Sequence, residues 1–479
     1  MMPSTLLLLS PLIIVTLTTV IAMLSIAVRR SHAAVASICA LGLIGSVAAI
    51  LYESAVFELP VTVTSLLAVD GLGLFFMAVF AVASLVVIGL AYDYLRRCNV
   101  EREELYILLM IATLGAMVLT SAVHFVSFFL GLEMLSVALY AMIGYRRTRI
   151  EALEAGIKYL LVAGASSAFL LFGMALIYAQ IGRMDFGAVW LLVHAEPGSA
   201  GLVVYAGLAM IFAGIGFKLA VVPFHMWTPD VYQGASAPVA AYIATVSKGA
   251  VVAVLLRLIA ASNTVTGDPL WLSIAVIAAL SMLGGNLLAL RQSNVKRLLA
   301  YSSIAHLGYL LVALLADGSV GSAAVTFYIV TYFATSLTAF GVVSVLSSRE
   351  RDAENISDYL GLYRRHPWLA LALSASLLSL AGIPLTAGFV GKFYIMAAGV
   401  NSHLWTLLVI LVLGSGIGLF YYLRVLIAMF TDAEDTESNE SPALGIFASL
   451  AVAASTLVVI WFGLYPEPLL RLIHQVIHI

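Results

Sequence analysis

The chain has 479 residues, of which 63% are hydrophobic and only 10% are charged. An average soluble domain is about 45–50% apolar and about 25% charged, and no water-soluble fold of this size can bury so much apolar surface. The composition predicts an integral membrane protein, and it excludes a secreted enzyme, a nucleic-acid-binding protein and a disordered scaffold. The formal net charge of −2 gives no long-range field that would indicate a partner.

The sequence contains no recognisable site for a redox cofactor. Its two cysteines, Cys39 and Cys98, are far apart and belong to no CxxC motif, whereas an iron–sulfur or zinc–thiolate site normally takes about four ligands. The sequence also lacks a GxGxxG motif, a phosphate-binding loop and an HExxH motif. We therefore expect any redox chemistry connected with this protein to use cofactors held elsewhere.

The apolar segments predict an all-α polytopic membrane protein, because a membrane-spanning helix needs about 20 mostly apolar residues. The fourteen expected segments lie near 5–27, 33–52, 71–95, 105–122, 123–143, 152–181, 201–226, 238–262, 270–290, 295–316, 321–347, 367–399, 402–430 and 441–465. The fourth and fifth segments are separated only by a short break at Thr120 and Ser121. Long continuous apolar runs argue against the alternating segments of about ten residues that build membrane β-barrels.

The arginines predict the orientation of these segments. If the N-terminus lies outside, fourteen arginines fall in inward loops and only Arg183 and Arg471 fall on the outward side. The inward residues are Arg29, Arg30, Arg96, Arg97, Arg102, Arg146, Arg147, Arg149, Arg291, Arg297, Arg349, Arg351, Arg364 and Arg365. The positive-inside rule then places both termini on the non-cytoplasmic side, and the acidic run 431–440 in a cytoplasmic loop.

The lysines have an unusual distribution. The chain has only five, and none occupies an ordinary polar loop; they are Lys158, Lys218, Lys248, Lys296 and Lys392. All except Lys296 lie inside apolar segments, where they are accompanied by Glu133 in the fifth segment and His306 in the tenth. An ionisable group near the bilayer centre costs several kcal/mol, so such residues are candidates for function.

Structural explanations compete with the functional one. Each lysine could belong to an ion pair that joins helices, or could extend its charged end to the membrane interface, and Lys296 is the one most expected to do the latter. Lys158 follows Glu154 by four residues, which is the spacing of an ordinary helical ion pair. We expect Arg257 and Arg424 to be interfacial or structural, because arginine does not release its proton in proteins.

Lysine, unlike arginine, can exchange a proton. Its ordinary pKa is about 10.4; desolvation lowers the pKa of a lysine and a nearby carboxylate raises it. A chain with arginine in its loops and lysine in its apolar interior is therefore suited to proton transfer. His306 could take part, or it could be a neutral hydrogen-bonded core residue.

Two apolar segments carry a proline close to one of these lysines. Pro223 follows Lys218 by five residues, and Pro384 precedes Lys392 by eight. Proline removes a helical hydrogen bond, so both segments are expected to be broken helices, although a simple kink is the alternative at each. Matching breaks in two halves of a transporter suggest repeats around an ion path.

The breaks divide the chain into four parts. We expect segments 1–3 in residues 1–104, a first five-helix repeat in 105–262, a second in 263–430, and the acidic loop with helix 14 in 431–479. One sequence does not establish whether the two repeats are inverted relative to each other.

Several long motifs resemble one known family. FKLAVVPFHMWTPDVYQGASAPVAAYIATVSKGA (217–250), NVKRLLAYSSIAHLGYLL (294–311) and LSLAGIPLTAGFVGKFY (378–394) resemble the antiporter-like subunits of respiratory complex I. The segments 130–147 and 151–182 resemble more narrowly the subunit N branch of the bacterial NADH–quinone oxidoreductases. The resemblance extends over nearly the whole chain.

This resemblance implies about fourteen helices, with two inverted five-helix repeats and broken seventh and twelfth helices. It implies a proton relay in which Glu133 pairs with Lys218, Lys248 links the two halves and Lys392 stands near the exit. His306 matches a connecting position in the tenth helix, and Lys158 matches a lysine of the sixth helix in the subunit N branch.

The resemblance also implies the cofactors, partners and location. NADH, FMN, iron–sulfur clusters and quinone would bind to other subunits, with no cofactor on this chain. The partners would be other membrane-arm subunits of complex I, lipid, protons and internal water, with no nucleic acid. The location would be the bacterial inner membrane, crossed many times.

Two other functions remain open at this point. A subunit of a multisubunit sodium/proton antiporter would share the fold, although Lys392 and the segment 151–182 argue against it. Alternatively, the chain could be a spacer that holds a complex together without moving protons. Neighbouring genes for NADH- and quinone-site subunits would favour complex I over the antiporter.

Overall fold

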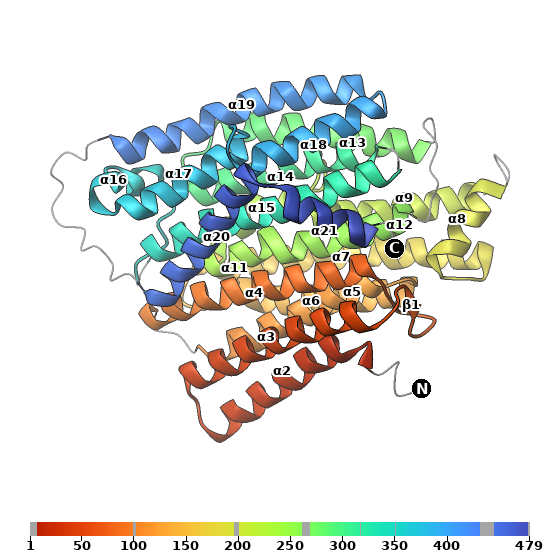
Figure 1. Cartoon of the computed structure of the whole chain (residues 1–479), viewed down its shortest axis with the longest axis horizontal. Coiled ribbons are helices and arrows are strands. Elements are labelled where there is room, and N and C mark those ends of the chain that lie inside the picture. The colour runs from red at the N-terminus through yellow and green to blue at the C-terminus, as the bar shows by residue number, and fades with distance from the viewer. Residues whose placement is uncertain are drawn as a thin grey trace.

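The computed structural model describes residues 7–98, 102–195, 201–260, 269–316, 318–349, 351–431 and 445–477. In this part of the chain the fold is a bundle of long helices that run roughly along one direction (Figure 1). Its sheet is one short hairpin, in which β1 (Val61–Thr62) pairs antiparallel with β2 (Ala68–Val69). Except for Thr431, the acidic run expected in a loop lies outside the described residues.

Thirteen helices of the described chain are long and apolar enough to cross a membrane. Those that cross as one regular helix are α2 (Ser10–Val28), α3 (His32–Val56), α4 (Gly71–Arg97), α5 (Glu104–Ser121), α6 (Phe125–Ile143), α7 (Ile150–Ile181), α13 (Pro269–Ala289), α14 (Val295–Leu314), α15 (Gly318–Leu346), α19 (Trp405–Phe430) and α20 (Ile446–Leu464). A helix bonds its own backbone groups internally, which is what lipid requires of a spanning segment. The predicted fold class is confirmed, including the division between α5 and α6.

The seventh crossing is broken, as Pro223 predicts. Helix α9 (Leu202–Leu219) ends at Ala220, whose φ of 62° is left-handed, and α10 (Trp227–Gly234) follows after an irregular segment. The indole N–H of Trp227 donates to the carbonyl of Phe217 at 3.0 Å and so ties α10 to the end of α9. The helix therefore ends earlier than the predicted limit of 226.

The twelfth crossing is broken in the same way. Helix α17 (Pro367–Ala381) ends at Gly382, with a φ of 86°, and α18 (Ala387–Asn401) begins after Pro384. The broken helix that Pro384 predicts within the segment 367–399 is therefore confirmed. With this divided crossing, each of the fourteen predicted segments contains helix in the structure.

The eighth crossing is the most buried of the spans. It consists of α11 (Ala237–Tyr242), one π-helical turn (Ile243–Ser247) and α12 (Lys248–Ala260). The π-helical turn ends directly before Lys248, and nothing in the sequence pattern predicted it.

Helices distant in sequence pack together around this core. Helix α20 lies against both α4 and α15, as the blue and orange ribbons in Figure 1 show. The carboxylate of Asp93 in α4 accepts from the backbone N–H of Ala448 at 2.8 Å and so caps the first turn of α20. A carboxylate at a helix N-terminus is favourable because it faces unpaired N–H groups.

Some short elements outside the crossings were not predicted. They are α8 (Phe186–Ala195), a 3₁₀ turn (Ile356–Tyr359), α16 (Leu362–Arg365) and α21 (Glu467–Ile477). Helix α21 is amphipathic and buries Leu469, Leu470 and Ile473 against α15 and α4. Elements β1 and α8 lie toward one end of the bundle and α16 lies toward the other (Figure 1).

The end of the bundle that carries α16 collects many of the arginines, and we call it the arginine-rich end. Arg97 donates from α4 to the carbonyls of Ser344, Val345 and Ser347 at the end of α15, at 2.8–3.0 Å. Cations are favourable there because the last carbonyls of a helix lack partners. These contacts bring the ends of α4 and α15 to the same side of the bundle.

Candidate functional site

Lys218 lies on the last turn of α9, directly before the break, and is buried. Its ammonium donates to Ser136 Oγ of α6 at 2.6 Å. Glu133, one turn earlier on α6, accepts instead from Ser167 Oγ of α7 at 2.5 Å. Glu133 is an electrostatic neighbour of Lys218, but the two side chains have different serine partners and form no direct ion pair.

Lys248 begins α12 and has no exposed surface. Its ammonium donates to Ser303 Oγ of α14 at 2.6 Å, and the hydroxyl of Tyr332 of α15 donates to the same oxygen at 2.7 Å. The ring of Tyr232 lies 5.6 Å from the Lys248 nitrogen, within cation–π range. Lys248 is thus held by neutral groups from three other elements.

His306 is enclosed by tyrosines. Its Nδ1 lies 2.7 Å from the hydroxyl of Tyr328, and its Nε2 lies 3.2 Å from the hydroxyl of Tyr422. The Tyr422 hydroxyl also bonds to Ser302, one turn before His306 on α14. Because each ring nitrogen has a hydroxyl partner that can donate or accept, His306 can hold its proton on either side.

Lys392 lies at the second break and is the last member of a row of buried ionisable residues, which are Lys218, Lys248, His306 and Lys392. Its ammonium donates to the carbonyls of Leu380 and Ala381 at 2.9 and 3.0 Å, and to Ser415 Oγ at 3.1 Å. These carbonyls are the last of α17, so the ammonium caps the broken helix. The ring of Tyr309 lies 5.1 Å from the nitrogen and connects this site to α14.

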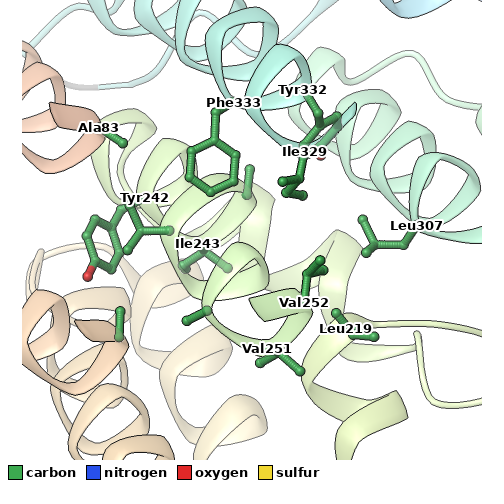
Figure 2. Packing of buried hydrophobic residues seen from close by; sticks show 14 of the residues in the cluster. Ala83, Leu219, Tyr242, Ile243, Val251, Val252, Leu307, Ile329, Tyr332 and Phe333 are labelled. Atoms are coloured by element: carbon green, nitrogen blue, oxygen red, sulfur yellow. The ribbon is translucent and has the colours of Figure 1, made fainter. Parts of the chain in front are cut away.

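Apolar side chains surround the row. Figure 2 shows Val252, Leu307 and Ile329, from α12, α14 and α15, pointing toward one another, and each is at most 1% exposed. A charge in such surroundings is poorly solvated, so the neutral form of a lysine becomes accessible. The packing therefore supplies the conditions under which a lysine can release a proton.

Lys158 lies in the apolar helix α7, as predicted, but it is not buried among the other helices, and its part in the relay stays a prediction. Its side chain is 46% exposed and forms ion pairs with Glu154 at 2.7 Å and with Asp230 at 2.9 Å. The i, i+4 pair that the sequence offered as the structural explanation is therefore present. These residues line a small cavity of about 110 Å³ between α7 and α10.

The Lys296 side chain does not reach the surface of the protein, so the expectation that it extends its charged end to the membrane interface is wrong. It is completely buried and pairs with Asp352, which is equally buried, at 2.6 Å. Its two other N–H groups donate to the carbonyls of Gln233 and Ala235 at 2.8 and 2.7 Å. Lys296 therefore fastens the end of α10 and the start of α11 to α14.

Asp352, in the segment after α15, gathers further groups at the arginine-rich end. The hydroxyl of Tyr94 donates to its Oδ1 at 2.7 Å, and the guanidinium groups of Arg146 and Arg149 lie 3.8 and 4.0 Å away. Burial alone would raise the pKa of the Asp352 carboxyl, but the Lys296 ammonium and these donors lower its pKa below the ordinary value. Asp352 is therefore a fixed anion that joins both halves of the chain.

The two other arginines of the apolar segments are structural, as expected. Arg257 forms a two-pronged ion pair with Asp70 at 2.7 and 2.8 Å, and Arg424 donates to the carbonyls of Leu290 and Gln292. Such planar, two-pronged contacts suit a guanidinium that remains charged.

The hydroxyl partners of the charged row were not predicted from the sequence. They are Ser136, Ser167, Ser302, Ser303, Ser415, Tyr328, Tyr332 and Tyr422. A weak signal existed, because Ser136 follows Glu133 by three residues and Ser302 and Ser303 precede His306 by four and three, which puts them on shared helix faces. The aromatic hydroxyls offered no comparable pattern.

The described residues contain no group of three or more His, Cys, Asp or Glu placed to hold a metal ion. Cys39 and Cys98 are both buried and form no disulfide. The site therefore consists of three buried amines and one imidazole, each with its own hydroxyl partners, and it extends across two broken helices.

Comparison with known proteins identifies the class. A family model described as "NADH:quinone oxidoreductase/Mrp antiporter, TM" matches residues 122–418. The chain belongs to this family of membrane subunits, and the resemblance to the antiporter-like subunits of complex I is confirmed.

Two individual relatives, which share one name, indicate a narrower group within this family. The chain is 46% identical over 464 residues to the NADH-quinone oxidoreductase subunit N of Methylococcus capsulatus, covering 96% of this chain and 93% of that protein. It is 47% identical over 479 residues to the protein of the same name from Ectopseudomonas mendocina, covering 97% and 95%.

Solved structures share the fold. A chain of respiratory complex I from Thermus thermophilus with bound aureothin matches with a TM-score of 0.82 at 34% identity, covering 96% of this chain and 98% of that one. A chain of the Mrp complex from a Dietzia species matches with a TM-score of 0.84 at 20% identity, covering 99% and 97%. The second likeness is one of fold alone.

Proposed function

We propose that this chain is subunit N of a bacterial NADH–quinone oxidoreductase and that it moves protons across the membrane. The observation that carries the proposal is the bonding of Lys218, Lys248 and Lys392. All three are buried, and each donates only to hydroxyl or carbonyl oxygens among the contacts of the described residues. None of these contacts is a carboxylate, so the loss of a proton breaks no direct ion pair at any of the three lysines, although Glu133 is an electrostatic neighbour of Lys218.

The relay runs through residues of both breaks. A proton taken up beside Glu133 reaches Lys218, passes to Lys248 and His306, and leaves from Lys392. Moving charge near one amine changes the pKa of the next, and a pKa change of one corresponds to about 1.36 kcal/mol. Water bridges the intervals that the side chains do not span.

Electron transfer belongs to other subunits in this proposal. NADH, FMN, iron–sulfur clusters and quinone bind elsewhere in the complex, and this chain holds no cofactor of its own. Its partners are the other membrane-arm subunits, the lipid bilayer, and the protons and internal water of the path. The name shared by the two bacterial relatives supports this division of labour.

The location and organisation follow from the same family. We place the chain in the bacterial inner membrane with the arginine-rich end toward the cytoplasm and both termini on the other side. Residues 105–262 and 263–430 form the two inverted repeats, each with one broken crossing, and residues 1–104 and 431–479 flank them. The equivalent breaks after Leu219 and Ala381 support this division.

The test uses inverted membrane vesicles that contain the whole complex. In Lys218→Met, NADH-driven proton uptake falls much more than quinone reduction, because the electron path does not include Lys218. Normal proton uptake in this variant overturns the proposal. A proton flux driven by a sodium gradient without NADH would instead indicate the antiporter function that the shared fold leaves open.

A further inference from the structure

Asp230, on the short helix α10, is held by cations from two sides. Its Oδ2 accepts from the ammonium of Lys158 on α7 at 2.9 Å, and its Oδ1 accepts from Arg297 on α14 at 2.7 Å. Each oxygen of the carboxylate therefore has a cation of its own. Asp230 in this way joins α10 to both α7 and α14, which pack against it although they lie far apart in the sequence.

A second attachment of α10 lies at Gln233. Its Oε1 accepts from the same Arg297 Nη1 at 3.0 Å, and Asp230 and Gln233 share a helix face because they are three residues apart. The backbone carbonyl of Gln233 accepts from the buried Lys296 at 2.8 Å. The last turn of α10 is therefore fastened to α14, whereas its first turn lies beside the break that follows Lys218.

Trp227, the first residue of α10, packs against the rings that face Lys218. Its ring centroid lies 4.8 Å from that of Tyr159 and 5.4 Å from that of Phe217. The Lys218 nitrogen in turn lies 6.0 Å from the Tyr159 ring centroid and 5.7 Å from that of Phe217. A displacement of α10 would therefore change the surroundings of the Lys218 ammonium.

Tyr232, five residues later on α10, lies beside Lys248. Its ring centroid is 5.6 Å from the Lys248 nitrogen, and the residue is completely buried. The face of an aromatic ring attracts a cation at this distance, and the neutral amine lacks that charge. One helix of eight residues therefore contributes to the surroundings of both Lys218 and Lys248, the two lysines between which the proposed relay passes a proton.

We propose that Asp230 is a positioning residue for the transfer of a proton between Lys218 and Lys248. It holds α10 at one place in the bundle, and α10 in turn holds the aromatic rings around the two lysines. Asp230 exchanges no proton in this proposal, because each of its oxygens accepts from a cation. The inference rests on the proposed function and names the contact that maintains the geometry of its relay.

The first test measures NADH-driven proton uptake per quinone reduced, in inverted vesicles that contain the intact complex. Asp230→Asn removes the anion that holds both cations, and we expect this ratio to fall about tenfold, since a misplacement of about 1 Å can cost about 100-fold in a reaction rate. Asp230→Glu keeps a carboxylate and is expected to retain the normal ratio. The ratio separates positioning from assembly, because a complex that fails to assemble is missing from both measurements.

Glu151→Gln is the matched control. Glu151 lines the same cavity between α7 and α10 as Asp230, but its carboxylate pairs with Arg149, so this variant is expected to keep the normal ratio. Lys158→Ala and Arg297→Ala provide a second comparison. Each of these single variants leaves Asp230 one cation, and only the double variant is expected to reach the low ratio of Asp230→Asn.

The outcomes separate this role of Asp230 from the proposed function. If Lys218→Met lowers proton uptake but Asp230→Asn leaves the ratio normal, the positioning role is wrong and the function stands. If Lys218→Met is also normal, the function itself fails. An equal fall in Asp230→Asn and Glu151→Gln, or an equal fall in Asp230→Asn and Asp230→Glu, overturns the positioning role, since the two ion pairs are then not what matters.

A second test asks whether α10 moves when its ion pairs are lost. Thr228, next to Trp227, is completely buried, and its hydroxyl has no hydrogen-bond partner among the described residues, so Thr228→Cys removes no such bond. N-ethylmaleimide is expected to label this thiol several-fold faster when Asp230→Asn is added, because a hydrated thiol forms the reactive thiolate. Adding Glu151→Gln should leave the labelling rate unchanged. Equal rates with and without Asp230→Asn would overturn the positioning role.

Discussion

Lys296 and Lys218 are both buried lysines in membrane crossings, yet their partners differ. Lys296 donates its three N–H groups to the carboxylate of Asp352 and to two backbone carbonyls, whereas Lys218 donates to a single serine hydroxyl. A proton lost from Lys296 would leave a buried anion without its counter-charge. A proton lost from Lys218 leaves a serine hydroxyl, which can donate as readily as accept, and breaks no direct ion pair, because Glu133 is an electrostatic neighbour rather than an ion-pair partner.

Burial therefore does not by itself identify a proton-transfer residue. An ammonium that faces a buried carboxylate and fixed carbonyls is held in its protonated form, and it joins helices. An ammonium that faces hydroxyl groups can lose its proton at a lower cost in free energy. The same chain uses the first arrangement at its arginine-rich end and the second in the middle of the bundle.

The largest expected effect is on the fixed pair. Asp352→Asn leaves the buried ammonium of Lys296 without a counter-charge, so we expect a loss of about 3–5 kcal/mol in the free energy of unfolding. Thermal unfolding of the purified complex, or its yield after assembly, measures this loss. Glu467→Gln is the control, since its pair with Arg471 is exposed and screened by solvent, so its loss is expected to leave stability close to normal. Equal stability of the two variants would remove the distinction between the regions.

The next effect is on the exchanging lysine. Lys218→Arg keeps the positive charge but does not release a proton, so proton uptake is expected to fall about 100-fold while the complex still assembles. Proton uptake and quinone reduction in the same vesicles separate the two properties. Arg297→Lys, in a surface ion pair with Asp230, keeps its charge and retains uptake. Near-normal uptake in Lys218→Arg would contradict the exchange of protons at this position.

Lys158 offers a smaller effect. Its two ion pairs are exposed, and pairs of this kind contribute about 1 kcal/mol or less. Lys158→Ala is therefore expected to leave stability and proton uptake close to normal in the same assays. A strong loss of uptake would return Lys158 to the relay that the family resemblance implied.

The smallest expected effect is the change in stability with pH near neutrality that arises from the ionisation of Asp352. Its pKa is lower in the folded chain than in an unfolded one, so its stabilising contribution is complete above the unfolded pKa of about 3.9. The contribution is lost as the pH falls through the lower, folded pKa. Unfolding of the wild type and of Asp352→Asn should therefore converge only under strong acid. Convergence already at neutral pH would mean that Asp352 is not held as an anion.

The sequence predicted the membrane crossings, the two breaks and the buried lysines because apolar runs and prolines act locally. Pro223 and Pro384 interrupt their own helices whatever surrounds them. The hydroxyl partners could not be predicted, since Lys218 and Ser136 are 82 residues apart in the sequence. Single serines and tyrosines also change the apolar pattern of a segment very little.

The pair of Asp352 with Lys296 could not be predicted for a related reason. Each stands next to a helix end in the sequence, where a charged residue is normally solvated. Their burial arises only when α4, α14 and the segments around Arg146 and Gln233 meet, which is a property of the tertiary structure. Lys158 differs from both, because its apolar helix α7 leaves its side chain exposed rather than buried.

The single π-helical turn at 243–247 has a consequence for the phase of the eighth crossing. A turn of this kind carries one residue more than an α-helical turn, so it rotates the downstream helix by about 100° relative to an unbroken α-helix. Upstream, Tyr242 points its hydroxyl to Thr113 of α5 at 3.2 Å; downstream, Lys248 faces Ser303 of α14. The eighth crossing therefore presents Tyr242 and Lys248 in two directions that a regular α-helix would not allow. Deleting one residue of this turn would lengthen no loop and remove no charge, yet it would oblige either the tyrosine or the lysine to face the wrong neighbour.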